Sequence, residues 1–179
     1  MGQSWKRVFA STALAALLFA AAGPVSSEPG WAEGPLDSIA RNLSTPEALA
    51  RFLHSHITFQ EDLPLFGQAD YWQAPEELLA RGRGDCEDYA LLACDLLSRR
   101  GAKAFLFSLY GTGGYAHTVC VFMDGGRYSV MNQDRLVRYR AASMEDLAGR
   151  LYSGWEWGAV AERRGHRGRA VRIIRRGQG

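Results

Sequence analysis

The 179-residue chain has no uninterrupted apolar run of 18 or more residues, so a protein with several membrane spans is excluded. It also has no internal repeat, and its 22% charged and 47% hydrophobic residues are typical of a folded globular protein rather than a disordered or collagen-like one. The glycine-rich stretch 111–114 is not followed by a helix with Lys-Ser or Lys-Thr, which excludes a phosphate loop. What remains is a single domain with enough aromatic side chains to fill a core.

The first 27 residues have the pattern of a secretory signal peptide. Lys6 and Arg7 precede an apolar stretch at 8–22, and small residues with a proline follow it. We expect cleavage between Ala22 and Ser27; an uncleaved anchor is the alternative. The sequence therefore predicts export to the periplasm or the medium, with no membrane span left after cleavage.

Charge divides the remaining chain into two segments. The expected domain, 28–160, carries 12 basic and 18 acidic residues, whereas the segment 161–179 carries seven arginines and one glutamate. This basic tail is interpreted as a solvated end, with contact to an anionic envelope polymer or to the acidic domain as alternatives. Export argues against nucleic acid as its partner.

The pattern of helix and strand signals predicts an α+β domain. Helices are expected at 35–41, from Pro46, from Pro75 to Leu79, at 86–100 and from Ser143 to Leu151, with a loop at 58–70. Strands are expected at 104–110, 115–123, 127–131 and 155–160, and an edge strand at 170–174.

Cysteine is scarce, because the chain contains only Cys86, Cys94 and Cys120. An odd number leaves at least one unpaired thiol in an exported protein, and Cys86 is the candidate nucleophile. It lies at the first turn of the 86–100 helix, where the helix dipole and free N–H groups favour a thiolate and can hold an oxyanion. The acids Asp85, Glu87 and Asp88 oppose the thiolate, so an imidazolium is needed nearby.

His117 is the candidate base. It shares a strand face with Val119 and Val121, and it meets Cys86 if the helix packs on that face. Cys120 then points away from the site, which disfavours a Cys94–Cys120 disulfide. The following hairpin places Asn132 beside His117 to orient the imidazole, with Asp134 as the alternative third member.

Two sequence blocks, YWQAPEEL at 71–78 and GDCEDYA at 84–90, carry a resemblance to a known family. Together with the strand at 117–119 and the short hairpin after it, they resemble the bacterial transglutaminase-like cysteine peptidases. The resemblance spans residues 70–138 and implies a papain-like, transglutaminase-like core, in which a nucleophile-bearing helix packs on a small antiparallel sheet. It also implies a Cys-His-Asp triad, matched by Cys86 and His117, whereas Asn132 and Gln133 stand where the family usually has an Asp-Asn pair.

Some relatives use calcium, and the resemblance puts such ligands at Asp85, Glu87 and Asp88; no other cofactor is expected. Trp72 and Gln73 are expected to border the cleft, with Gln73 assisting the oxyanion hole. The sequence thus predicts an exported thiol hydrolase that cleaves peptide or amide bonds of a protein or peptide substrate in the cell envelope, through an acyl-enzyme. An acyl-transferring transglutaminase and a catalytically inactive binding module remain the alternatives.

Overall fold

The structure, a computed structural model, describes residues 34–164 and 167–177. The predicted signal peptide and its cleavage site lie outside these residues. Among the described residues, no helix combines the length and the apolar character that crossing a bilayer requires.

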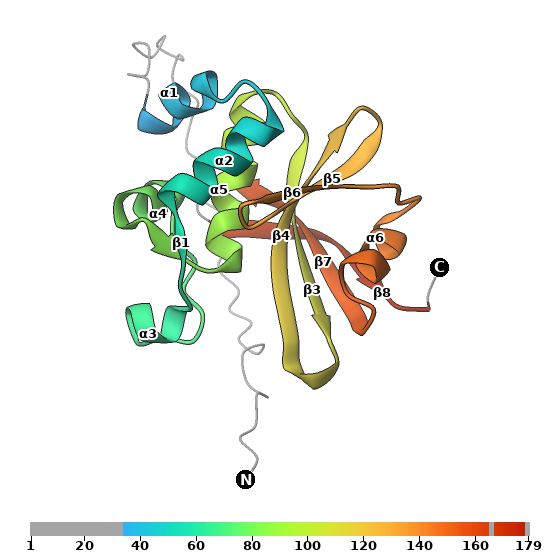
Figure 1. Cartoon of the computed structure of the whole chain (residues 1–179). Helices are drawn as coiled ribbons and strands as arrows, with labels where there is room; N and C mark the ends of the chain where they lie inside the picture. The colour runs from blue at the N-terminus through green and yellow to red at the C-terminus, as the bar shows by residue number, and fades with distance from the viewer. Residues whose placement is uncertain (1–33, 165–166, 178–179) are drawn as a thin grey trace, which may run out of the picture. The chain divides into compact units, whose positions relative to one another are not determined.

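One antiparallel sheet forms the centre of the fold (Figure 1). Its six strands lie in the order β6-β5-β4-β3-β7-β8, so β4 and β3 occupy the middle and β6 and β8 the edges. A short 3₁₀ turn, Thr112–Gly114, joins the two middle strands. The strands are β3 Ala104–Gly111, β4 Tyr115–Asp124, β5 Arg127–Asn132, β6 Arg135–Tyr139, β7 Trp155–Arg164 and β8 Arg167–Arg175.

The helices cover both faces of this sheet. Their starts follow local signals in the sequence: Thr45 accepts the backbone N–H of Ala48 at 3.1 Å, and Pro46 opens the helix where no N–H partner is needed. They are α1 Pro35–Asn42, α2 Pro46–His56, α3 Asp62–Phe66, α4 Pro75–Arg81, α5 Cys86–Arg99 and α6 Met144–Leu151. Two short strands, β1 Thr58–Phe59 and β2 Arg83–Gly84, pair in parallel beside them.

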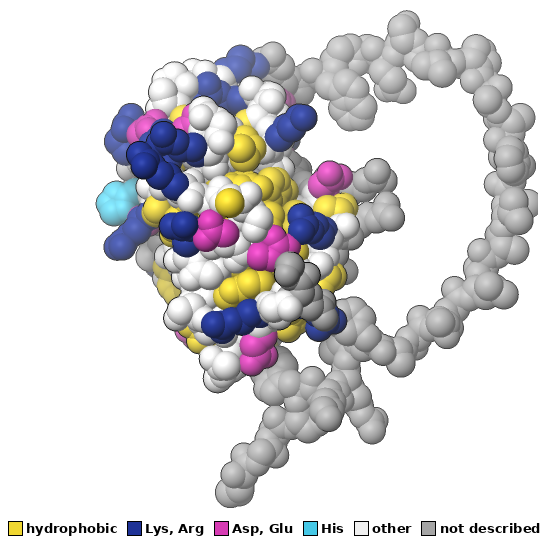
Figure 2. Space-filling model, turned by 90° about the vertical axis from the view of Figure 1, so that its right-hand side faces the viewer, with side chains coloured by type: hydrophobic (Ala, Val, Ile, Leu, Met, Phe, Trp, Pro, Cys, Tyr) yellow, Lys and Arg dark blue, Asp and Glu magenta, His cyan; other side chains and the backbone are white. Residues whose placement is uncertain are grey.

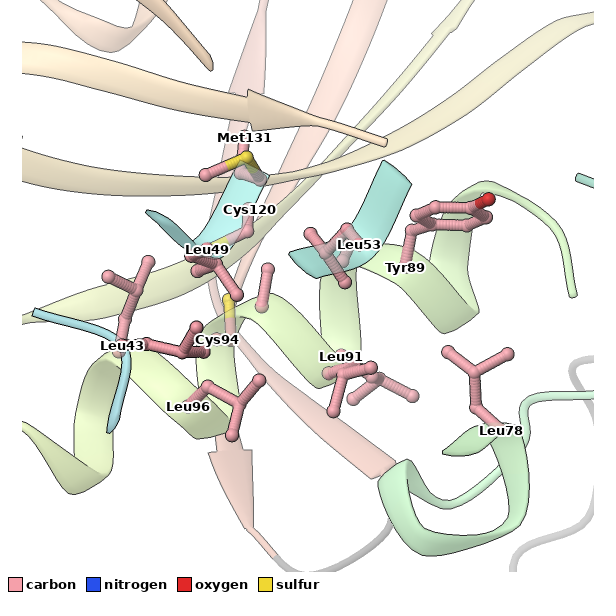
Figure 3. Close-up of a cluster of buried hydrophobic side chains, with 14 of the residues drawn as sticks. Leu43, Leu49, Leu53, Leu78, Tyr89, Leu91, Cys94, Leu96, Cys120 and Met131 are labelled. Carbon is pink, nitrogen blue, oxygen red and sulfur yellow. The ribbon is translucent and has the colours of Figure 1, made fainter. Parts of the chain in front are cut away.

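Two buried clusters fill the two faces of the sheet. On one face, α5 packs against alternate side chains of the central strands, and α1, α2 and α4 cover its other sides. On the opposite face, α6 packs against the remaining side chains of β3, β4 and β5. The α+β prediction is therefore confirmed, including the antiparallel sheet with the Cys86 helix packed on it. Figure 3 shows members of the first cluster, among them Leu49, Leu53, Leu91, Leu96, Cys94, Cys120 and Met131.

One prediction about these faces was wrong. Cys120 lies on the α5 side, in the same cluster as Cys94 (Figure 3), while Val119 and Val121 pack in the α6 cluster. The expectation assumed that α5 packs on the face of residues 117, 119 and 121, and strand alternation then placed Cys120 on the wrong side. Cys94 and Cys120 are fully buried, and no disulfide joins them.

Four elements were missed. Pro64 and Gly67 suggested a loop, but Pro64 lies in the first turn of α3, where its missing N–H does no harm, and Gly67 ends that helix at φ 69°. The strand β6 returns from β5 through only two residues, Gln133 and Asp134. The other two are the two-residue strands β1 and β2, which pair with each other; β1 lies in the expected loop, and β2 ends just before Asp85.

The arginine-rich segment belongs to the sheet. β7 continues past residue 160 to Arg164, and β8 covers the sheet edge over a longer range than the expected 170–174. Arg172 on β8 pairs with Glu145 of α6 at 2.7 Å. Figure 2 shows basic and acidic side chains interspersed on the face that lies to the right in Figure 1. The described part of this segment is thus an edge strand of the sheet, and its exposed side chains include Val171 and Ile173 as well as arginines.

Candidate active site

Cys86 occupies the first residue of α5, and its position is fixed by the segment directly before it. Gln60 N donates to Gly84 O at 2.9 Å, which anchors β2 to β1. A Cβ on Gly84 would lie only 2.3 Å from Asp88 Oδ2 and 2.7 Å from Gln73 Nε2. Glycine is therefore required here, because the start of α5 packs directly onto the backbone before it.

The sulfur of Cys86 lies between an acid and a strand. The Cys86 thiol donates to Glu87 Oε2 at 3.1 Å, and the backbone of Thr118, the residue after His117, acts in the opposite sense by lowering the pKa of the thiol. Burial, followed by the charge of Glu87, raises the pKa of the Cys86 thiol above its ordinary value. The helix N-terminus was expected to favour the thiolate, but in this structure desolvation and the neighbouring carboxylates outweigh it.

His117 and Asn132 are brought together as the sequence indicated. His117 Nε2 lies 2.8 Å from Asn132 Oδ1. An amide oxygen can only accept, so Nε2 is the donor and Nδ1 of the neutral ring keeps its lone pair. All three side chains, Cys86, His117 and Asn132, are partly exposed, so a substrate can reach them.

The site lies where β4 separates from β5. The ladder between these strands ends at the pair Cys120–Met131, and β5 itself ends at Asn132. Beyond this pair, Thr118 keeps its partner Ser108 on β3 but has none on β5, and its backbone is close enough to Cys86 to lower the pKa of the thiol. The end of the ladder therefore explains how α5 meets the His117 strand, although the helix packs on the face opposite to the one expected.

Asp134 faces another element. Its Oδ2 lies 2.7 Å from Nδ1 of His54, in the last turn of α2. The structure thus separates the two alternatives for the third member: Asn132 contacts the His117 ring, and Asp134 contacts His54.

Gln73 has a different role from the one expected. The side chain is fully buried, and its Nε2 donates both to Arg83 O at 2.9 Å and to Asp88 Oδ2 at 2.5 Å. Both amide hydrogens are therefore used within the protein, so the expected oxyanion contact is wrong. Trp72 is partly exposed, and its Nε1 donates to Asp70 Oδ1 at 2.9 Å.

Carboxylates surround the start of α5; Asp62, Glu87 and Asp88 are buried, Asp85 is partly exposed and Asp70 is exposed. Asp85, Glu87 and Asp88 are joined by two acids from the preceding segment, Asp62 and Asp70, and the ligand atoms of Asp62, Asp85 and Asp88 lie within 4.8 Å of one another, as do those of Asp62, Asp70 and Glu87. Burial raises the pKa of Asp88 to about 6, even though Gln73 donates to its carboxylate. Burial is likewise the main cause that raises the pKa values of Asp62, Asp85 and Glu87. Within the described part of the chain, no salt bridge joins a basic side chain to any of these four carboxylates.

The cluster fits a calcium ion. Asp62 Oδ1 and Asp85 Oδ1 are buried without a hydrogen-bond partner among the described residues. Calcium takes six to eight oxygen ligands with flexible geometry, and carboxylates on a short loop are its usual donors. Asp85, Glu87 and Asp88 were identified in the sequence; Asp62 and Asp70 were not, because no local pattern connects the α3 segment to Cys86.

A stacked tyrosine pair beside His117 was also missed. The rings of Tyr115 and Tyr152 stack with centroids 3.8 Å apart, and the Tyr115 and His117 centroids are 6.3 Å apart. Period-two alternation on β4 could have placed Tyr115 on the His117 face, but nothing in the sequence indicated its contact with Tyr152.

Comparison with known proteins gives a family match. Residues 32–143 match the sequence profile of the bacterial transglutaminase-like cysteine proteinases. Human and mouse centrosomal protein of 76 kDa are each 38% identical over 69 residues, which cover 37% of this chain. The matched part spans about a tenth of the length of those proteins.

Solved structures give weaker likenesses. Calcium-bound LapG from Legionella pneumophila is 19% identical, with a TM-score of 0.46 and 69% of each chain covered. A structure described as a TGase is 12% identical, with a TM-score of 0.43, over 62% of this chain and 34% of that chain. The match to the sequence profile, over more than half of the chain, is the finding that decides the family.

Proposed function

Because the chain belongs to the bacterial transglutaminase-like cysteine proteinases, we propose that Cys86, His117 and Asn132 are its catalytic triad and that it hydrolyses peptide bonds. The observation that carries the proposal is the 2.8 Å bond between His117 Nε2 and Asn132 Oδ1, on the strand whose next residue, Thr118, lowers the pKa of the Cys86 thiol. The imidazole is thereby held in the tautomer that leaves Nδ1 free to accept a proton.

The reaction proceeds through an acyl-enzyme. His117 Nδ1 takes the thiol proton as Cys86 Sγ attacks the substrate carbonyl carbon, and a tetrahedral intermediate forms. The backbone N–H of Cys86, at the start of α5, stabilises the oxyanion. Protonated His117 then gives its proton to the leaving amine, and a water molecule, deprotonated by the same ring, hydrolyses the thioester.

Calcium bound by the cluster of Asp62, Asp70, Asp85, Glu87 and Asp88 would supply the positive charge that these acids lack. Glu87 faces the Cys86 sulfur, and its charge contributes to the raised pKa of the thiol. Neutralising this carboxylate makes the thiolate easier to form. The chain's own residues perform the chemistry, and a bound cation would only reduce the negative charge around the Cys86 sulfur.

We also propose that the protein acts outside the cytoplasm, on a protein or peptide of the cell envelope. Support comes from the signal-peptide pattern of residues 1–27, which lie outside the described structure.

The test is a cleavage assay on envelope proteins with calcium present. The protein and its Cys86→Ala variant are incubated with an envelope extract, and new N-termini are identified by mass spectrometry. Cleavage products that require Cys86 support the peptidase. Incorporation of a labelled amine in place of water would favour the transglutaminase alternative. Identical products with both forms would overturn the catalytic assignment and favour a binding module.

A further inference from the structure

The turn after Asn132 is conformationally strained. Asn132 and Arg135 are ladder partners, so only Gln133 and Asp134 connect β5 to β6. Gln133 adopts φ 53° and is the one non-glycine residue with positive φ in the described part of the chain. A residue with a Cβ loses about 1–2 kcal/mol in this region relative to its ordinary conformations. Neighbouring contacts must therefore hold the turn in place.

Each end of this turn is attached to a different element. On one side, the Asn132 side chain binds His117 on β4. On the other, Asp134 Oδ2 lies 2.7 Å from Nδ1 of His54, which is 80 residues earlier in the chain. The His54 side chain is 77% exposed, so its contact with Asp134 matters more than its packing.

The Asp134 carboxylate also lies near α5. Tyr89, one turn after Cys86, donates its hydroxyl to Ile57 O at 2.8 Å, just past the end of α2. Burial, and then the charge of Asp134, raises the pKa of Tyr89 to about 12. Asp134 thus lies close enough to α5 for its charge to act on Tyr89, while its hydrogen bond to His54 attaches the turn to α2.

We propose that His54 and Asp134 are positioning residues: their pair holds the Gln133 turn so that Asn132 Oδ1 stays against Nε2 of His117. The inference rests on the proposed triad and extends it to a second hydrogen-bonded pair. It gives a role to Asp134, an acid two residues from Asn132 whose carboxylate contacts His54 and not the His117 ring. It also gives a role to an exposed histidine far from the nucleophile.

The chain offers a matched control for this proposal. Glu47 on α2 and Arg138 on β6 pair at 2.7 Å, and they also join α2 to β6. Arg138 lies four residues beyond the turn and bonds Asp124 as well. If general attachment of α2 to β6 were what mattered, breaking either pair would have the same effect on the site.

The experiment measures the rate of Cys86 alkylation by iodoacetamide at one pH with calcium present. Cys94 and Cys120 are fully buried, so mass spectrometry can assign the labelled thiol. His54→Ala and Asp134→Ala are each expected to slow alkylation about two- to fivefold, the range that a partly exposed ion pair supplies. Glu47→Gln is expected to leave the rate within about 1.5-fold, the small effect typical of a surface substitution.

Rescue separates positioning from general stability. Glycine adopts the φ of residue 133 without strain, so Gln133→Gly is expected to restore the His54→Ala rate to within about twofold of the parent. NMR of the His117 ring gives a second readout: the Nε2–H signal is expected to broaden in His54→Ala and to sharpen again in the double variant.

Two outcomes are distinguishable. If His54→Ala and Asp134→Ala behave like Glu47→Gln in both rate and ring signal, the positioning role is overturned while the triad stands. If Asn132→Ala itself changes neither the rate nor the His117 signal, the proposed triad fails first.

Discussion

The two ends of α5 differ in whether their buried carboxylates form ion pairs. Near the C-terminal end, Asp95 is almost fully buried and pairs with Arg99 at 2.9 Å, and Arg99 also bonds Asp37. At the N-terminal end, Glu87 and Asp88 are buried too, yet no ion pair within the described residues involves them. The buried acid at the C-terminal end is paired with an arginine, whereas burial raises the pKa values of the two carboxylates at the N-terminal end.

The turns between these ends are apolar and fully buried. Leu91, Leu92, Ala93 and Cys94 are each 0% exposed. Hydrophobic burial of this middle section holds α5 on the sheet, and this stability makes an unfavourable first turn tolerable. The comparison teaches that the stabilising and the chemical parts of the helix are separate, so they should respond to different changes.

The largest effect is expected from the middle section. Leu91→Ala should lower the free energy of unfolding by about 2–5 kcal/mol, because it removes a fully buried side chain and leaves a cavity. Urea denaturation measures it. Leu63→Ala is the control, since Leu63 is 62% exposed and its loss should change stability by less than about 0.5 kcal/mol. Equal effects of the two variants would contradict the assigned core.

Gly84→Ala should act on the first turn. Its Cβ would overlap Asp88 and Gln73, which costs about 1–3 kcal/mol and displaces the start of α5. We expect lower stability in urea together with slower alkylation of Cys86. Gly149→Ala on α6 is the control, because its Cβ would meet nothing nearer than 3.7 Å. If Gly84→Ala alters neither quantity, the close packing before Cys86 is wrong.

The acids at the first turn predict an unusual pH dependence. Glu87 has an ordinary pKa of 4.5 and a raised one of about 9 in the folded protein. An acid whose folded pKa is raised stabilises the protein below its unfolded pKa, and this contribution is lost as the pH rises toward the folded value. Without divalent cations, the melting temperature should therefore fall by about 3 °C or more between pH 5 and pH 9.

Calcium should reverse this trend, because its ligands must be deprotonated. Calorimetry with calcium or with a chelator measures both slopes. In Asp62→Asn, the calcium-dependent rise in melting temperature should be smaller. If calcium does not change the melting temperature at any pH, the cation site is wrong.

The smallest effect is expected at the other end of the helix. Arg99→Gln should cost about 1 kcal/mol, because the Arg99 and Asp37 side chains are partly exposed to solvent and a glutamine amide can still donate a hydrogen bond to the buried Asp95. Cys86 alkylation should stay unchanged, which separates the two ends directly. A matching loss of thiol reactivity would mean that the two ends are coupled after all.

Much of this fold could be predicted from local sequence signals. Caps, prolines and apolar periodicity located the start of α2 and both ends of α5 within one or two residues, and alternation located the β3–β4–β5 meander. The face on which α5 packs could not be predicted. Alternation along a strand shows which side chains share a face, but it does not show which of the two faces a helix covers. Helix α3 was missed because proline and glycine, here Pro64 and Gly67, are also common in loops.

The candidate site likewise consists of residues that local sequence signals identify and residues that only tertiary contacts bring to it. Cys86 and His117 lie in recognisable local contexts, and the short hairpin brought Asn132 within reach. The contacts of Asp62, His54 and Gln73 depend on segments that only tertiary packing brings together. Burial of the acidic turn, which raises the pKa of the Cys86 thiol, is likewise a property of the packed structure.

The most direct test of the central claim is the rate of Cys86 alkylation in calcium, compared between the parent protein and its His117→Ala variant. If Cys86, His117 and Asn132 act as one unit, the parent thiol reacts rapidly near neutral pH and the variant at least about tenfold more slowly, in line with the usual contribution of a general base. A slow thiol that is indifferent to His117→Ala would contradict the account.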